Sequence, residues 1–250
     1  MNKVYALCLG WRNIDRHLIL GMDGVGSIVL NYYMWVIRGQ DKYIVVDTGF
    51  DVKEAEKRGV KDIVDPRIML ARLGINNESV HDVIVSHLHW DHFGGWRYFP
   101  NAIFYVQKKE IECMRNDSIV SNERVKRFYT NMEEIELLSM DGRIKTLEDE
   151  SIIGDGVTSF WVGGHTPGCQ AVEVKLENQR KTILAVDSSF YLENYEKRIP
   201  PLLSLNTIEA IEAFEVLSKR IGNEQVVLIP GHDPGVMSQD LIASGVVGIR

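Results

Sequence analysis

Three histidines and an aspartate lie within six positions of the stretch VIVSHLHWDHFGGW, residues 83–96. These residues are His87, His89, Asp91 and His92. His87 and His89 are two residues apart, so along an extended chain their imidazoles point the same way. Asp91 and His92 follow a bend, so they can address a second point nearby. The spacing therefore predicts two half-sites for metal ions on one loop.

The donor types indicate what kind of metal site this would be. Structural zinc sites favour thiolates, whereas histidine with carboxylate is typical of sites that keep a position open for water. No cysteine lies near the cluster. Imidazole with carboxylate suits Zn, Fe, Mn or Co about equally. The stretch therefore predicts a catalytic metal centre rather than a structural one.

Three more polar residues follow apolar stretches further along the chain. They are His165 in GGHTPG, Asp187 in LAVDSS and His232 in IPGHDPG. Together with HxHxDH they resemble the signature of the metallo-β-lactamase superfamily. The resemblance covers essentially the whole chain, from Asp47-Thr48-Gly49 to His232. It implies an α/β fold, the αββα four-layer sandwich, with the metals at one edge of its two sheets.

The resemblance also implies a role for each matched residue. One metal ion would be held by His87, His89 and His165. A second ion would be held by Asp91, His92 and His232. Asp187 would bridge the two ions. Asp47 would support the ligand loop from behind, as metal ligands commonly need orienting partners. The implied cofactors are two divalent ions, with zinc the first choice and Fe, Mn or Co as alternatives.

Such a pair of ions defines a reaction class. Two divalent ions about 3.5–4 Å apart can share a water, lower its pKa toward neutrality and polarise a substrate carbonyl. No serine or cysteine nucleophile is then required. Asp91 would accept the hydroxide proton and pass it to the leaving group, which makes it the predicted catalytic residue. We expect hydrolysis of an ester, lactone, thioester, amide or phosphodiester.

Within the superfamily the layout looks most like the N-acyl-homoserine lactonase branch and its relatives that open other small lactones. The total length, the DSS at the strand end of Asp187, and a terminal GHD with only a short tail after His232 point there. That branch places a substrate-binding tyrosine three residues after the bridging aspartate. Here that position is Phe190, and Tyr191 comes one later. Phe190, Tyr191 and Trp90 are the predicted substrate-binding residues, although Trp90 could instead pack behind the pocket.

Other members of the superfamily stay open as alternatives. The same centre could hydrolyse a cyclic amide or a thioester, or the chain could resemble a mononuclear-iron persulfide dioxygenase. Glyoxalase II carries a helical domain after the last metal histidine, and only 18 residues follow His232 here. Flavodiiron oxygen reductases have a glutamate at the position of His89. We therefore expect a lactonase first and these alternatives second.

Composition limits the partners and the location. The 250 residues carry a net charge of −7, which provides no basic surface for nucleic acid or an anionic membrane. No apolar run approaches the roughly 18 residues of a membrane span, and no secretory leader is evident. We expect a single domain, 1–250, that acts in the cytoplasm on a small molecule, without a nucleic-acid or membrane partner. The sequence does not distinguish a monomer from a homodimer.

Strands must carry these side chains to one place. Segments rich in β-branched and aromatic residues predict strands over 3–10, 26–39, 41–50, 81–87, 102–107, 143–147, 157–164, 169–176, 181–189 and finally 225–233. Strand after strand ends on a histidine or an aspartate. Loops at strand ends are where rigid scaffolds present functional groups.

Helices are predicted between some of these strands. One spans 53–73 and ends at Gly74, with Ile68, Leu70 and Leu73 buried. A second spans 206–222. It has an N-cap at Asn206, a capping-box partner at Glu209 and an apolar face. The residues of that face are Ile208, Ile211, Phe214, Leu217 and Ile221.

Residues 108–140 hold many charges and few large apolar positions, so we expect one or two partly exposed helices in a lid-like insertion. Phe128, Tyr129 and Met132 could enclose an apolar acyl chain there. The alternative is a packing surface, which is the commoner role of an amphipathic helix with one aromatic face.

Overall fold

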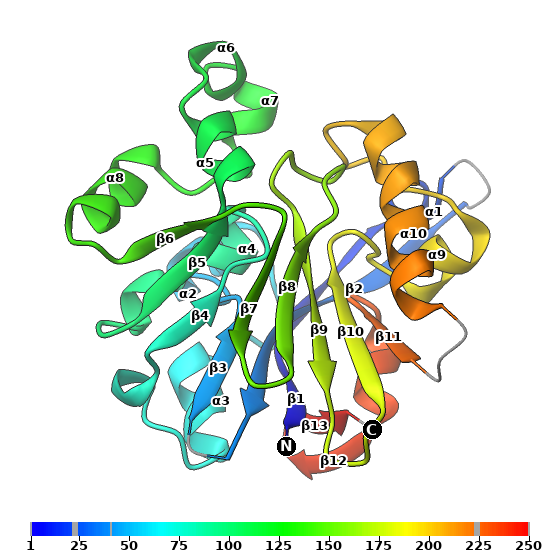
Figure 1. The fold of residues 1–250 in the computed structure, drawn as a ribbon. Helices are drawn as coiled ribbons and strands as arrows, with labels where there is room; N and C mark the ends of the chain where they lie inside the picture. Colours follow the sequence, from blue (N-terminus) through cyan, green and yellow to red (C-terminus); the bar gives the residue numbers. More distant parts are fainter. Residues whose placement is uncertain (1, 22–24, 41, 223–225, 250) are drawn as a thin grey trace.

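Two β-sheets face each other at the centre of the molecule, and helices cover their outer faces (Figure 1). This computed structural model describes residues 2–21, 25–40, 42–222 and 226–249. Asp41 and Gln225, with which two predicted strands begin, lie outside the described residues. The four layers confirm the predicted αββα sandwich.

The larger sheet contains eight described strands. Their order across the sheet is β12 (Asp240–Ala243), β13 (Val246–Ile249), β1 (Lys3–Asp15), β2 (Ser27–Arg38), β3 (Tyr43–Val46), β4 (Asp82–Ile84), β5 (Ile103–Gln107) and β6 (Ile144–Leu147). Strands β3 to β6 run parallel. Their carboxyl ends therefore meet at one edge of the sheet.

The smaller sheet contains five described strands, in the order β11 (Val226–Pro230), β10 (Lys181–Val186), β9 (Gln170–Lys175), β8 (Val157–Trp161) and β7 (Glu150–Gly154). Strands β10 and β11 are parallel. The space between the sheets is filled by alternating β-branched and aromatic residues such as Trp35, Ile84 and Val172. Period-two alternation puts these residues on the inner faces.

Helices lie between the strands in the sequence and pack outside the sheets. They are α1 (Arg16–Leu20), α2 (Val52–Lys57), α3 (Pro66–Arg72), α4 (Trp90–Phe93), α5 (Lys108–Met114), α6 (Asp117–Val120), α7 (Glu123–Lys126), α8 (Met132–Met140), α9 (Leu192–Lys197) and α10 (Thr207–Ile221). Short 3-10 turns span Asn77–Ser79, Trp96–Tyr98 and Pro234–Ser238. None of the helices in the described ranges is long and apolar enough to cross a bilayer.

The helix predicted over 53–73 is wrong, because two separate helices, α2 and α3, occupy that range. Gly59 has a φ of 74°, a left-handed conformation that ends the first helix. Pro66 starts the second helix, where its missing N–H leaves no donor unpaired. Ile68 is 53% exposed, contrary to the prediction, whereas Leu70 is buried.

Helix α10 begins and ends as predicted, but part of its predicted apolar face is wrong. Ile208 is 72% exposed, and Ile211 is also exposed. The buried stripe consists of Ala210, Ala213, Phe214 and Leu217. These positions share one face of a helix, and the two alanines let the helix approach the smaller sheet closely.

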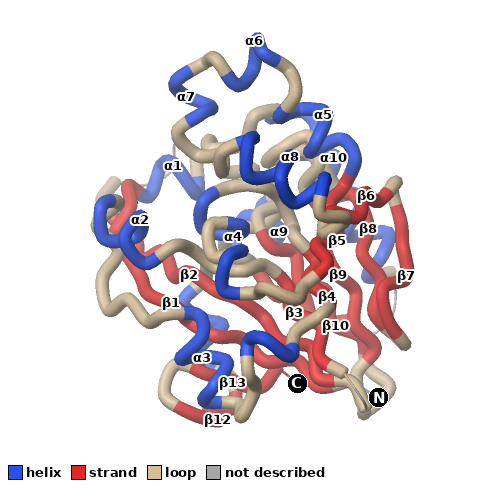
Figure 2. The backbone as a smooth tube through the Cα atoms, turned by 90° about the vertical axis from the view of Figure 1, so that its left-hand side faces the viewer, coloured by secondary structure: helices blue, strands red, loops and turns tan. Residues whose placement is uncertain are grey.

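Other predicted boundaries and elements also differ from the structure. Strand β1 continues past Gly10 to Asp15, so Arg12 lies inside a strand. Residues 225–233 do not form the final strand, because β12 and β13 follow. Residues 108–140 form four short helices, α5 to α8, rather than one or two. Figure 2 shows α6 and α7 at the end of the molecule opposite both termini.

Candidate metal centre

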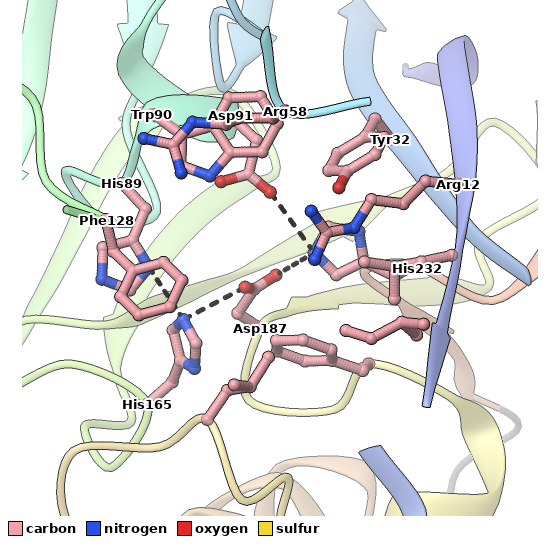
Figure 3. A pocket seen from close by; sticks show the side chains of 14 residues that line it. Arg12, Tyr32, Arg58, His89, Trp90, Asp91, Phe128, His165, Asp187 and His232 are labelled. Carbon is pink, nitrogen blue, oxygen red and sulfur yellow. Dashed lines mark hydrogen bonds and ion pairs between the residues drawn. The ribbon is translucent and has the colours of Figure 1, made fainter. Parts of the chain in front are cut away.

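The predicted ligands all come from loops that follow the carboxyl ends of strands. The chain leaving β4 carries His87 and His89, and the loop after β8 carries His165. Asp187 directly follows β10, and His232 follows β11. Because these ends meet at one edge of the two sheets, residues far apart in sequence share one site. Figure 3 shows several of them around a common space.

The bend in the histidine-rich loop is the start of helix α4. His89 is its N-cap in an extended conformation, so Asp91 and His92 turn away in the first helical turn. Two glycines follow, and Gly95 packs on the loop after β3. A Cβ added at Gly95 would lie 2.3 Å from the carbonyl oxygen of Thr48, so a larger residue would separate the two loops.

The first ligand group comprises His87, His89 and His165, whose nearest donor atoms all lie within 4.8 Å of one another. Nε2 of His165 is 3.1 Å from Nδ1 of His89. Oδ2 of Asp187 lies 3.2 Å from Nε2 of His165 and 3.7 Å from Nε2 of His87. One carboxylate oxygen therefore faces this group.

The second group comprises Asp91, His92 and His232. Oδ1 of Asp187 lies 3.3 Å from Nε2 of His92 and 3.0 Å from Nε2 of His232. Oδ2 of Asp91 lies 3.6 Å from Nε2 of His92 and 4.0 Å from Nε2 of His232. The two oxygens of Asp187 thus face different ligand groups.

Unpaired nitrogen atoms show that a cation fits here. Nε2 of His87 and Nε2 of His92 are buried and form no hydrogen bond within the described part of the chain. Buried polar atoms are nearly always paired, so such atoms require an explanation. A divalent cation accepts imidazole lone pairs and neutralises the buried carboxylate. The residues present therefore suit divalent metal ions.

The protonation states differ between the two groups. Burial lowers the pKa of His87 and of His89 well below the usual value, and it lowers the pKa of His165 to about 4. These rings are neutral at pH 7 and offer free lone pairs. Burial also lowers the pKa of His92, but neighbouring carboxylates, Asp187 first, outweigh burial and raise it well above the usual value. Metal binding at the second group must therefore displace a proton.

The backbone before Asp187 is strained. Val186 has a φ of 47°, which is rare for a β-branched residue. The pairing of β10 with β11 shifts register between Leu184 and Val186. Such bulges redirect a side chain at a strand end, and strain of this kind is concentrated at functional sites. Here it places Asp187 between the two ligand groups.

Asp47 lies behind the ligand loop, fully buried. Its Oδ2 is 2.7 Å from Nδ1 of His92, and it accepts hydrogen bonds from the backbone N–H and the hydroxyl of Ser86. The hydroxyl of Ser86 is also 3.0 Å from Nδ1 of His87. His232 is oriented separately, through Nδ1 donating to the carbonyl of Asn31 at 2.6 Å. Each of these contacts leaves Nε2 facing the centre.

Replacing Asp47 by alanine is expected to weaken metal binding about 10- to 100-fold, because His92 loses the carboxylate that fixes its ring. Competition with a chromogenic chelator measures the affinity. The exposed Asp51 is a matched control, because its Asp51→Asn variant keeps the cap of α2. Equal affinities for the Asp47→Ala protein and the wild type would remove this role.

Glu110 on α5 was not predicted from the sequence. It is fully buried and accepts hydrogen bonds from the backbone N–H of Leu88 at 3.0 Å and of Gly168 at 2.9 Å. It therefore joins the loop of His87 and His89 to the loop of His165. In the sequence it is one of many charged residues in 108–140, and its pairing depends on a contact 58 residues away.

Glu209 has a related task. The backbone N–H of Glu209 binds the Asn206 cap, as predicted. The predicted capping box is wrong, because the Glu209 side chain accepts from the backbone N–H of Gly164 at 2.9 Å, and the N–H of Asn206 donates to the carbonyl of Gly164 instead. The carboxylate thus holds the residue before His165 through a hydrogen bond that the sequence did not reveal.

A cavity of about 60 Å³ opens beside the ligands. Trp90 lines it and stacks on Phe50, with ring centroids 6.0 Å apart. Phe190 also lines it, 4.7 Å from the His232 ring. Tyr191 does not line it, because this residue starts α9 and its hydroxyl donates to the carbonyl of Val29. The structure thus brings Trp90 and Phe190 to the ligands, but not Tyr191.

The segment before α8 touches the ligand loop. Phe128 lines the cavity, and its carbonyl accepts from the N–H of Trp90 at 2.8 Å. Tyr129 is buried against the His89 ring, 4.7 Å away, and does not line the cavity. Met132 does not line it either. Of the three side chains expected to enclose an acyl chain, Phe128 alone lies there.

Comparison with known proteins identifies the family of the chain. The model of the metallo-beta-lactamase superfamily matches residues 28–232. An N-acyl homoserine lactonase of Bacillus sp. is 26% identical over 248 residues, covering 93% of this chain and 94% of its own length. The N-acyl homoserine lactonase AiiA of Bacillus thuringiensis subsp. kurstaki is 27% identical over 254 residues, with the same two coverages. The predicted resemblance to this branch is confirmed.

Solved structures show the same fold. A quorum-quenching N-acyl homoserine lactone lactonase superposes with a TM-score of 0.80 at 24% identity, covering 93% of this chain and 92% of its own. Fold and site together define a metal-dependent hydrolase, the predicted class of enzyme. The chain belongs to the metallo-β-lactamase superfamily.

Proposed function

We propose that the chain is a lactonase that opens a small lactone, an N-acyl-homoserine lactone or another small ring, at a centre of two divalent ions. The division of the ligands into two groups on either side of Asp187 carries the proposal. The relatives named N-acyl homoserine lactonases, which match over 93% of the chain, support the substrate class. Zinc is the proposed metal, and the cytoplasm the proposed location.

The residues divide the work of ring opening between them. Bound ions would supply a hydroxide at neutral pH and polarise the lactone carbonyl. Asp187 would hold its charge between the two ligand groups, where its carboxylate is already placed. Asp91 lines the cavity, so its free oxygen can take the proton of the attacking water and return it to the ring oxygen that leaves.

Part of the cavity wall suits an apolar ring or chain. Ile14, Leu30, Leu203, Phe128 and Phe190 line it beside the ligands. Apolar walls with a few placed polar groups are typical of small-molecule sites. Phe190 carries no hydroxyl at the position where the resembled branch has a tyrosine, so we propose the class of small lactones rather than one member of it.

A substrate panel tests this function. Zinc-loaded protein is incubated with acyl-homoserine lactones, γ-lactones, a cyclic amide, a thioester and a phosphodiester, and acid release is followed with a pH indicator. We expect turnover of lactones at least about 10-fold above that of every other class, a preference of about 1.4 kcal/mol in transition-state binding. Turnover only of cyclic amides or thioesters would contradict the proposal.

Replacing Asp91 by asparagine is expected to lower kcat about 100- to 10,000-fold, because the amide cannot accept the proton. At least one metal ion per chain should remain, since the other ligands are intact. Metal analysis and lactone turnover are measured on the same sample. Asp141→Asn, at an exposed helix end, is the matched control. Unchanged kcat in the Asp91→Asn protein would rule out its role in proton transfer.

A further inference from the structure

Arg12 is a cation in the cavity without a described partner. It lies on β1 opposite Leu30 and lines the space beside Asp91 and His232 (Figure 3). Its Nε is buried, and the guanidinium forms no hydrogen bond or ion pair with any residue that the structure describes. A buried or half-buried charge without a partner is costly, so an arginine held in this way calls for an anion.

Arg58 lines the same cavity, but its guanidinium is paired within the protein. Its Nε donates to Glu54 at 2.8 Å, and its Nη2 donates to the carbonyl of Arg127 at 2.6 Å. Its guanidinium also stacks on the ring of Trp90, 4.6 Å from the centroid. The charge of Arg58 is therefore engaged by the protein itself, whereas the charge of Arg12 is available to a ligand.

Tyr32 adds a second available donor beside Arg12. Its ring is buried against His232 and Trp90, with centroids 5.7 and 5.4 Å away. Tyr32 lines the cavity, and its hydroxyl forms no hydrogen bond with a residue that the structure describes. A phenol is protonated at neutral pH and can donate a hydrogen bond. In Figure 3 the hydroxyl points into the space that Arg12 borders.

The donors of these two side chains match a carboxylate. A guanidinium presents parallel N–H groups that fit both oxygens of a carboxylate, and a phenol can donate to the same group. A neutral acyl chain or ring would leave the Arg12 charge desolvated and unpaired. An acidic substituent would pair with the Arg12 charge, and this pairing would stabilise the bound substrate.

We propose that the substrate is an acidic lactone, whose carboxylate substituent is bound by Arg12 and Tyr32 while the ring carbonyl lies at the ligand groups. This inference rests on the proposed lactonase function and specifies its substrate class. Arg12 is then a specificity-determining residue: it binds a group that takes no part in the bond cleavage.

The test uses two γ-lactones that differ at one ring carbon. One carries a carboxylate beside the ring oxygen (5-oxotetrahydrofuran-2-carboxylate), and the other carries a methyl group there (γ-valerolactone). We expect zinc-loaded wild type to prefer the acidic lactone by at least about 10-fold in kcat/KM. Arg12→Met should lower kcat/KM for the acidic lactone about 10- to 100-fold and for the neutral lactone less than about 3-fold.

Two further variants refine the result. Arg12→Lys keeps the charge and should recover part of the preference, whereas Tyr32→Phe should lose only a smaller part. The neutral lactone serves as the internal control for folding and for the metal centre in every variant. A preference of the wild type for the neutral lactone would overturn the proposal. So would an equal loss on both lactones in Arg12→Met, which would place Arg12 at the reacting carbonyl or in the scaffold.

A binding measurement separates this inference from the lactonase function. The ring-opened products, 2-hydroxyglutarate and 4-hydroxyvalerate, share one carboxylate and differ by the second. Calorimetry with zinc-loaded protein should show that Arg12→Met weakens the binding of 2-hydroxyglutarate about 10-fold or more and leaves the binding of 4-hydroxyvalerate unchanged. If neither lactone is opened, the proposed function fails, and this comparison still decides the anion site. Equal binding of the dicarboxylate by both proteins would overturn it.

Discussion

Replacing Asp187 by asparagine is expected to remove one metal ion per chain and to lower lactone turnover about 1,000-fold or more. The carboxylate has one oxygen toward each ligand group, 3.2 Å from Nε2 of His165 and 3.0 Å from Nε2 of His232. An amide has one oxygen with a free lone pair and one nitrogen that only donates, so it can bind a metal ion on the side of only one ligand group. The other group would face an N–H where it needs a lone pair.

Elemental analysis of the Asp187→Asn protein after zinc loading measures the first effect, and lactone turnover measures the second. Asp155→Asn is the matched control, because that aspartate is exposed in the turn between β7 and β8. Two ions per chain with undiminished turnover in Asp187→Asn would contradict the bridging geometry as the basis of function.

Removing the metal is expected to abolish lactone turnover and to lower the thermal stability. The apoprotein buries a carboxylate among imidazoles whose Nε2 atoms have no partner, as at His87 and His92. Bound metal at about 1,000 times its dissociation constant would stabilise the fold by about 4 kcal/mol. For a chain of this size that corresponds to a fall in Tm of about 10 °C on chelation.

Titration of zinc into the chelated protein provides the stoichiometry. Turnover and Tm should both rise until two equivalents are bound and then remain constant. Calcium at the same concentration is a useful contrast, since the imidazole-rich donor set disfavours calcium. Full turnover in the apoprotein, or recovery complete at one equivalent, would contradict a two-ion centre.

The candidate ligands could be identified from the sequence because their pattern is local. His87, His89, Asp91 and His92 share one loop, and that loop keeps its spacing whatever the rest of the fold does. Asp187 and the other distant ligands each follow an apolar strand, and parallel strands carry such residues to one edge. The sequence therefore predicts which strand ends carry the polar side chains, and the structure brings all of these side chains together.

Contacts between distant elements could not be read in the same way. Glu110 stands among many charged residues of a helical segment, and only the fold shows that it joins two ligand loops. Arg12 follows Gly10 and Trp11, which looked like the end of a strand, yet β1 continues and turns the side chain into the cavity. Such roles depend on which neighbour a face meets, and no local pattern contains that information.

The same reason explains the errors in the helices. Ile208 and Ile211 have helical spacing and high hydrophobicity, but α10 packs through Ala210 and Ala213 because small residues permit the closest approach to the sheet. Tyr191 was expected near the substrate from its position in the chain. Its hydroxyl instead binds the carbonyl of Val29, and the place beside the ligands belongs to Phe190.

Anomalous diffraction from crystals of the zinc-loaded protein, recorded at the zinc edge, tests the central claim most directly. The two ligand groups predict two peaks, one on each side of the Asp187 carboxylate. One peak should lie among His87, His89 and His165, and the other among Asp91, His92 and His232. A single peak, or a peak at any other residues of the chain, would contradict the two-ion centre.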